Sequence, residues 1–184
     1  MNAFAKAKYF LKIFNDVSLV SAQSRKTLSE LLVFLRAANM LSLFAHKVVR
    51  EDMLYELPEN FRWHITSNIN YSERQQYQVG IEIDRINLLL EDAGITPVFL
   101  KGAAYNIEKV ASLEGRTMSD IDILVSSSEI KKTEKRLLSL GWQAKELSNY
   151  DEKYYREFAH EIPPMFDPIS GTTLDIHHNL YLLG

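Results

Sequence analysis

The sequence of 184 residues contains no cysteine. This excludes disulfides, thiolate nucleophiles and thiolate-bound zinc or iron–sulfur centres, and it is typical of a reducing compartment. The sequence also lacks the run of about 18 apolar residues that a membrane-spanning helix needs. Its first 16 residues mix lysines with aromatic residues, whereas a signal peptide has an uninterrupted apolar core. We therefore expect a cytoplasmic protein with no membrane partner.

The sequence has no excess of basic residues either, since its formal net charge is −3. Binding along an extended nucleic acid usually requires a surplus of Lys and Arg, so we do not expect that class of partner. Hydrophobic residues make up 46% and charged residues 24%, a balance that is typical of a globular protein and not of a disordered one. The length suits one domain, or one domain with a helical extension.

The first half of the chain carries a helical pattern. Apolar residues recur at helical spacing in three segments: 28–35, 41–48 and 72–92. Ser24 or Thr27 suits the N-cap of the first segment, and Gly94 suits the residue that follows the last helix. Residues 57–70 begin with a turn signal, Leu-Pro-Glu-Asn, and continue with a stretch that the pattern leaves unassigned. We predict a helical N-terminal region over residues 1–94.

From residue 95 the pattern changes to short alternating segments. Strands are predicted at 97–100, 120–125, 142–147 and 172–177. Helices are predicted from 103 to about 110 and from 128 to 140. The second of these helices has a capping-box signature, Ser126 with Glu129, and a stop at Gly141. Residues 150–160 fit a helix or an edge strand equally well. We predict an α+β domain over residues 95–184.

The segment Met-Ser-Asp-Ile-Asp-Ile-Leu-Val, residues 118–125, presents two carboxylates together. In a strand, alternate side chains share a face, so Asp120 and Asp122 would lie opposite the core-facing isoleucines. Aspartate is unfavourable in strands, and such departures from propensity concentrate at functional sites. Paired carboxylates are suitable ligands for Mg²⁺. The alternative is that the two aspartates form the solvated face of a half-buried strand.

Two further motifs contain polar residues that suit a phosphate or metal site. A predicted strand ends in Lys101-Gly102, where glycine allows close backbone approach to a phosphate and the lysine adds positive charge; a simple strand-to-helix turn is the alternative. In the segment Leu-Asp-Ile-His-His, Asp175 and His177 would share the polar face of a strand. No ligands at zinc-finger spacing flank this segment, so a zinc site is not indicated.

The order of these motifs resembles the uncharacterised nucleotidyltransferase family of the DNA polymerase β-like superfamily. The resemblance covers roughly residues 95–180 and rests on Leu-Lys-Gly, Arg-x-Met-Ser-Asp-Ile-Asp-Ile-Leu-Val, Gly-Trp and Leu-Asp-Ile-His-His. It implies a mixed sheet flanked by helices, and we expect transfer of a nucleoside monophosphate from an NTP, with ATP as the expected donor, to a hydroxyl acceptor with release of pyrophosphate. It also implies that Asp120 and Asp122 bind Mg²⁺ (or Mn²⁺) with the triphosphate, while Asp175 holds a second metal and helps to activate the acceptor.

Further contacts to the nucleotide are expected from six residues: Lys101, Gly102, Ala103, Arg116, Ser119 and His177. Ala103 stands where the superfamily commonly has glycine or serine, so backbone N–H groups and Lys101 would have to replace a hydroxyl contact to phosphate. Arg116 lies in a long connection before Asp120 and is the candidate for an extra phosphate contact. Chains of this kind tend to continue beyond the third carboxylate, so a portion that binds the nucleobase or the acceptor is expected to be missing.

Two other functions remain open from the sequence. A catalytically degenerate member would keep the fold and only bind a nucleotide or a partner protein, and Ala103 together with the short C-terminal part favours it. A glycosyltransferase also uses Asp-x-Asp to bind metal and nucleotide sugar. That reading is disfavoured because residues 1–94 show no βαβ alternation ahead of the aspartates.

Overall fold

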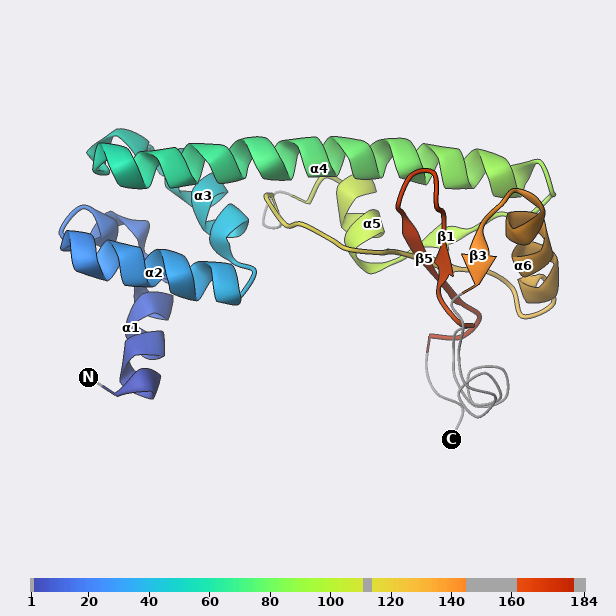
Figure 1. Ribbon diagram of the computed structural model, residues 1–184, viewed down its shortest axis with the longest axis horizontal. Helices are drawn as coiled ribbons and strands as arrows, with labels where there is room; N and C mark the ends of the chain where they lie inside the picture. The colour runs from blue at the N-terminus through green and yellow to red at the C-terminus, as the bar shows by residue number, and fades with distance from the viewer. Residues whose placement is uncertain (1, 111–113, 145–161, 181–184) are drawn as a thin grey trace. The chain divides into compact units, whose positions relative to one another are not determined.

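A computed structural model describes residues 2–110, 114–144 and 162–180 (Figure 1). The chain packs as two compact units, described separately below. The helical unit comprises residues 1–76 and 110–117, and the sheet unit comprises 77–109 and 118–184. The predicted division at residue 94 follows the change from helices to strands, whereas the packing divides the chain after Gln76, within a helix. The unassigned segment 150–160 lies outside the described residues.

The helical unit is built from short helices and the first part of a long one: α1 (Ala3–Asn15), η1 (Val17–Val20), α2 (Arg25–Ala37), α3 (Leu41–Arg50), η2 (Leu54–Glu56) and α4 (Glu59–Glu91). The Ser24 side chain accepts a hydrogen bond from Thr27 N at 3.2 Å, so Ser24 is the N-cap of α2. Leu31, Leu35 and Phe44 are fully buried in the core of this unit. No helix in the described part of the chain is long and apolar enough to cross a membrane.

Helix α4 is longer than the predicted segment 72–92, because it begins at Glu59 and includes the stretch that the sequence left unassigned. Polar residues in this stretch interrupt the helical spacing of the apolar residues, so the sequence pattern did not indicate a helix. Two of them, Thr66 and Asn68, bond to the backbone carbonyls of Arg62 and His64 within the helix. The helix ends at Glu91, and Gly94 follows it as predicted, with a φ of 66° and an N–H that donates to the Glu91 carbonyl at 2.7 Å.

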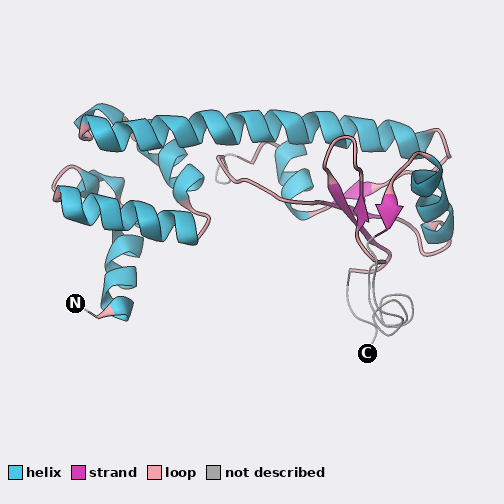
Figure 2. Ribbon diagram, in the orientation of Figure 1, coloured by secondary structure: helices cyan, strands magenta, loops and turns pink. Residues whose placement is uncertain are grey.

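Within the described residues, five strands form one mixed sheet in the order β1-β2-β5-β4-β3. Figure 2 shows the strands in magenta. They are β1 (Val98–Phe99), β2 (Ile121–Leu124), β3 (Gln143–Ala144), β4 (Met165–Phe166) and β5 (Thr173–His177). Strands β2 and β5 are parallel, and the other pairs are antiparallel. The α+β class and the mixed sheet are therefore confirmed. Strand β4 was not predicted, because two residues between prolines are too few to show alternation.

One face of this sheet forms the core of the sheet unit. Ile121, Ile123 and Val125 from the β2 segment are buried together with Leu174 and Ile176 from β5. The apolar side chains of the C-terminal half of α4 belong to the same core: Val79, Ile83, Ile86 and Leu90. Since side chains alternate along a strand, Asp122 and Asp175 lie on the opposite face of the sheet.

Two short helices complete the sheet unit, α5 (Lys101–Ile107) and α6 (Ile130–Ser139). The predicted capping box at the start of α6 is wrong. Glu129 is the N-cap and makes no side-chain cap bond. The Ser126 hydroxyl pairs with the Ser128 hydroxyl at 2.8 Å, and the Ser126 carbonyl closes a turn by accepting the Glu129 N–H. The hydroxyl therefore has a local partner and does not cap the helix.

Candidate active site

The register of β2 and β5 brings two carboxylates side by side. Asp122 pairs with Asp175, while the flanking pairs Ile121–Leu174 and Ile123–Ile176 face the core. Residues paired in register on neighbouring strands lie on the same face, about 4.8 Å apart. Asp122 and Asp175 are therefore adjacent on the polar face of the sheet.

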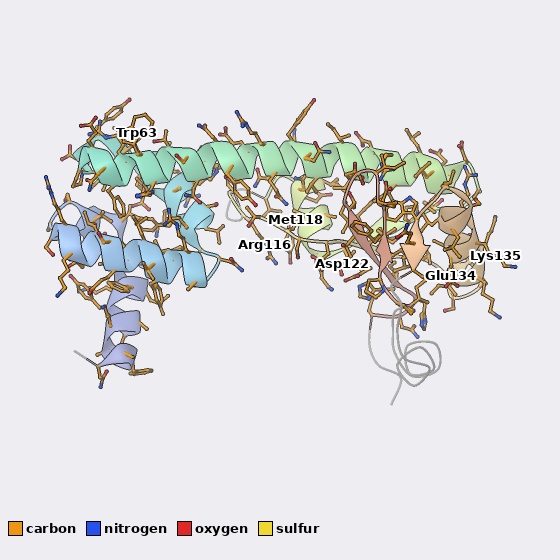
Figure 3. All side chains as sticks on the ribbon, in the orientation of Figure 1. Trp63, Arg116, Met118, Asp122, Glu134 and Lys135 are labelled. Atoms are coloured by element: carbon orange, nitrogen blue, oxygen red, sulfur yellow. The ribbon has the colours of Figure 1, made fainter. Side chains whose placement is uncertain are left out.

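Asp122, which is labelled in Figure 3, is buried. Two side chains from other elements bind it. Lys101, at the start of α5, donates from Nζ to Oδ1 at 2.5 Å. His177, at the end of β5, donates from Nε2 to the same oxygen at 3.0 Å. A buried carboxyl group without partners would be strongly unfavourable, so these two bonds explain how Asp122 can be buried at this position.

Asp120 lies immediately before β2 and is partly buried. Its Oδ1 accepts a hydrogen bond from the hydroxyl of its neighbour Ser119 at 3.1 Å. Over residues 2–110, 114–144 and 162–180, no group of three or more histidine, aspartate or glutamate side chains is arranged to hold a metal ion. Asp120 is thus close in sequence to Asp122, but Asp120, Asp122 and Asp175 do not form a three-ligand metal group in the described residues.

The chemistry of the adjacent carboxylates nevertheless fits a divalent cation. Mg²⁺ and Mn²⁺ prefer oxygen ligands, and Asp122 and Asp175 offer four carboxylate oxygens on neighbouring strands. Asp122 already binds one cationic group, the Lys101 ammonium. Asp122 and Asp175 are therefore the residues best placed to hold such an ion, with Asp120 the next carboxylate along the chain.

The turn that precedes α5 has a strained backbone. Lys101 has a φ of 45°, in the left-handed region that residues other than glycine rarely adopt. Gly102 is buried, and a Cβ at this position would lie 3.1 Å from the Met118 sulfur. Ala103 is only 1% exposed and belongs to the apolar core. Close packing thus accounts for Gly102 and Ala103, and phosphate binding by their backbone stays a prediction.

Arg116 belongs to the segment that packs within the helical unit, where its carbonyl lies 3.5 Å from the Gln76 side-chain nitrogen. Its contact with phosphate stays a prediction. The preceding residue, Gly115, has a φ of 83° and is buried against His46 and the Ser42 carbonyl. His46 in turn bonds to the buried hydroxyl of Ser72 at 2.9 Å. This packing was not predicted, because its only signal in the sequence is a glycine flanked by charged residues.

An ion-pair network around Arg85, with two buried carboxylates, was not predicted from the sequence either. The guanidinium binds Asp167 at 2.5 Å, Glu82 at 2.8 Å and the Ser170 hydroxyl at 3.0 Å. It also lies over the Trp142 ring, 5.4 Å from the centroid. Burial alone would raise the pKa of Asp167, but hydrogen bonds from the Ile169 N–H, Arg85 and Ser170 outweigh it and lower that pKa. This network joins α4 to the turn between β4 and β5.

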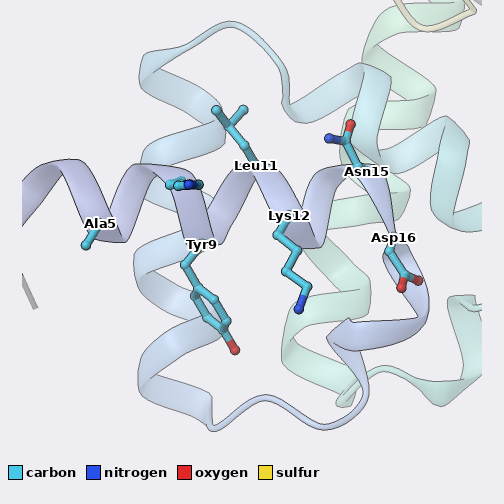
Figure 4. A pocket seen from close by; sticks show the side chains of 7 residues that line it. Ala5, Tyr9, Leu11, Lys12, Asn15 and Asp16 are labelled. Atoms are coloured by element: carbon cyan, nitrogen blue, oxygen red, sulfur yellow. The ribbon is translucent and has the colours of Figure 1, made fainter.

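A separate hollow of about 690 Å³ lies along α1 in the helical unit (Figure 4). Its lining residues are Ala5, Lys8, Tyr9, Leu11, Lys12, Asn15 and Asp16. None of the carboxylates or nucleotide-binding residues predicted from the sequence is among them. The hollow is therefore not the candidate active site.

The sequence model of a family described as "uncharacterised nucleotidyltransferase" matches residues 24–183. The match includes α2, α3 and all of α4, and so extends well beyond the segment 95–180 that carries the motifs. No curated protein and no solved structure matches the chain.

Proposed function

The chain belongs to the uncharacterised nucleotidyltransferase family, and we propose that it transfers a nucleoside monophosphate from a nucleoside triphosphate to a hydroxyl acceptor. ATP is the proposed donor, and pyrophosphate is the second product. The observation that carries this proposal is the parallel register of Asp122 with Asp175. It supports a shared cation site on the polar face of the sheet, which is what the transfer chemistry requires.

In this proposal each carboxylate has a separate role. Asp122 and Asp120 would hold a divalent cation together with the triphosphate, and Asp175, in register beside Asp122, would hold a second cation near the acceptor hydroxyl. His177 orients Asp122, since its Nε2 lies 3.0 Å from Oδ1 on a side that is closed to solvent. Ser119 binds Asp120 and orients it in the same way. Lys101 and the backbone at Gly102 and Ala103 are the proposed phosphate contacts.

The reaction balances as a simple displacement. The acceptor oxygen forms a bond to the α-phosphorus, the bond from that phosphorus to the bridging oxygen breaks, and the electron pair leaves with pyrophosphate. Bound Mg²⁺ or Mn²⁺ would neutralise the triphosphate and favour ionisation of the acceptor hydroxyl. Asp175, in register beside Asp122, is the protein group proposed to assist removal of the hydroxyl proton.

A thermal-shift comparison tests the donor class. We expect the melting temperature to rise with ATP and Mn²⁺ together by more than with either alone, and nucleotide sugars with Mn²⁺ to give no comparable rise. Bound ligand at a hundredfold excess over its dissociation constant stabilises the folded state by about 2.7 kcal/mol. A shift with nucleotide sugars and not with ATP would instead support a glycosyltransferase.

A catalytically degenerate nucleotide-binding protein is the second candidate. It is favoured by the ion pair of Lys101 with Asp122, and by the lack of a three-ligand metal group among the residues described. Binding of ATP and Mn²⁺ without any transfer of the α-phosphoryl group to an acceptor would select this candidate over the enzyme.

A further inference from the structure

The cation that lies at Asp122 in this structure is a lysine side chain. Lys101 Nζ is 2.5 Å from Asp122 Oδ1. The Asp122 side chain is only 6% exposed, whereas that of Lys101 is 59% exposed. The carboxylate is therefore fixed in the protein, while the lysine reaches it from the solvent side and has room to move away.

We propose that the Lys101 ammonium occupies the place of a divalent cation at Asp122, so that lysine and metal bind there in turn. This rests on the proposed function, which supplies the cation. A cation ligated by Asp122 would lie about 2.0–2.1 Å from a carboxylate oxygen. The Lys101 ammonium lies 2.5 Å from Oδ1 of the same carboxylate, so the two positive charges would be close enough to repel each other strongly. One of them has to leave, and only Lys101 is exposed enough to do so without unfolding.

The backbone around Lys101 is arranged so that only the side chain needs to move. Leu100 donates its N–H to the Asp122 carbonyl at 2.9 Å, and Ala104 donates to the Leu100 carbonyl at 3.2 Å. These bonds hold the turn against β2 independently of the Lys101 side chain. They also hold Lys101 at its strained φ of 45°. Such strain persists only where the surroundings impose it, and it concentrates at functional sites.

Displacement gives Lys101 a second partner. An ammonium that leaves Asp122 when a metal–triphosphate complex binds remains next to the negatively charged phosphates, which are favourable partners for it. Lys101 would therefore weaken the binding of the free cation and strengthen the binding of the cation–nucleotide complex. A residue with a purely structural role would not change these two affinities in opposite directions.

Lys101→Met separates the two effects. We expect this variant to bind free Mn²⁺ on the order of fivefold more tightly than the wild type, because a competing ion pair of about 1 kcal/mol is removed. Its affinity for ATP in the presence of saturating Mn²⁺ should fall. Free Mn²⁺ is measured by electron paramagnetic resonance, and ATP binding is measured by titration calorimetry.

Two further variants serve as controls, one for the loss of a positive charge and one for misfolding of Lys101→Met. Lys109→Met is the matched control, because Lys109 is also exposed and its backbone also lies in the left-handed region, with a φ of 49°. This variant loses the same charge, and its affinities for free Mn²⁺ and for ATP with Mn²⁺ should be unchanged. Lys101→Gly removes the ammonium and relieves the backbone strain, so it should reproduce the tighter Mn²⁺ binding even if Lys101→Met folds poorly.

The outcomes distinguish this inference from the proposed function. If Lys101→Met and Lys101→Gly bind Mn²⁺ no more tightly than the wild type, while Asp122→Asn loses binding, the exchange is refuted and the metal site stands. If Asp122→Asn binds Mn²⁺ as the wild type does, the site itself is wrong. Absence of Mn²⁺ binding in the wild type and in both Lys101 variants would overturn both proposals.

Discussion

Arg85→Met should destabilise the sheet unit strongly, because it leaves two buried carboxylates without their cation. The Glu82 side chain is 8% exposed and the Asp167 side chain is 4% exposed. Removing one partner of a buried ion pair costs about 3–5 kcal/mol. Methionine keeps an unbranched apolar side chain next to Trp142, so the loss of packing is small in comparison.

Asp167→Asn is the milder change at the same network. Arg85 keeps its bonds to Glu82 and has 34% of its side chain exposed to water, so no buried charge is left alone. The loss of a hydrogen bond to a charged group costs about 1.5–3 kcal/mol. With about 2–4 °C per kcal/mol for a chain of this size, we expect melting temperatures to fall by about 10 °C for Arg85→Met and about 5 °C for Asp167→Asn.

The pKa of Asp167 fixes the pH dependence of this effect. Since that pKa is lowered from its ordinary 3.8 in the folded state, the stabilisation is complete above about pH 4 and is lost as the pH falls through the folded-state value. The difference in unfolding free energy between the wild type and Asp167→Asn should therefore be constant from pH 7 to pH 5 and should shrink below pH 4.

Tryptophan fluorescence during denaturant unfolding is a suitable assay. Trp142 is 3% exposed and reports on the sheet unit, whereas Trp63 is 67% exposed, so Trp63→Phe serves as the common background. The reasoning is refuted if Arg85→Met costs less than Asp167→Asn. It is also refuted if the difference in unfolding free energy between the wild type and Asp167→Asn grows as the pH falls below 4.

Two further predictions concern the helical unit and the carboxylates. Gly115→Ala and Gly171→Ala both place alanine at a positive φ, 83° and 76°, but only Gly115 meets other atoms, the His46 ring and the Ser42 carbonyl. We expect Gly115→Ala to lower the free energy of unfolding, measured by chemical denaturation, by about 1–3 kcal/mol more than Gly171→Ala does. Equal losses in the two variants would contradict the packing described for His46. Asp122→Asn should abolish any rise in melting temperature caused by Mn²⁺, while the metal-free stability changes by less than about 1 kcal/mol, because the exposed Lys101 ammonium returns to water. If Mn²⁺ still raises the melting temperature of both Asp122→Asn and Asp120→Asn, the two aspartates do not bind the metal and are only the solvated face of a strand.

The sequence predicted the parts of the fold that local patterns determine. Alternation along 120–125 and 172–177 predicted β2, β5 and their buried isoleucines, because side-chain direction in a strand depends only on position. Gly94 and Gly141 were predicted as helix ends, and both have a positive φ. The first half of α4 was not predicted. Its buried residues, such as Phe61 and Ile65, are separated by polar residues that are compatible with a helix but do not form a recognisable helical pattern.

The interactions at the site depend on tertiary structure and could not be read from local patterns. Asp122 and Asp175 were both candidates, but their parallel register follows from a strand pairing that no local signal encodes. The ion pair of Lys101 with Asp122 depends on a strained turn at Lys101, where the sequence indicated a phosphate contact or a simple strand-to-helix turn. Arg85 and Asp167 are far apart in the chain, and neither lies in a motif.

Transfer of label from ATP is the most direct test of a nucleotidyltransferase site. The protein is incubated with Mn²⁺, a cell extract as the source of acceptors, and ATP radiolabelled at either the α- or the γ-phosphorus. We expect the α-label to appear on an acceptor and the γ-label to leave with pyrophosphate, and we expect Asp122→Asn and Asp175→Asn to abolish the α-labelling. Transfer of the γ-label, or α-labelling that persists in both variants, would contradict the proposed function.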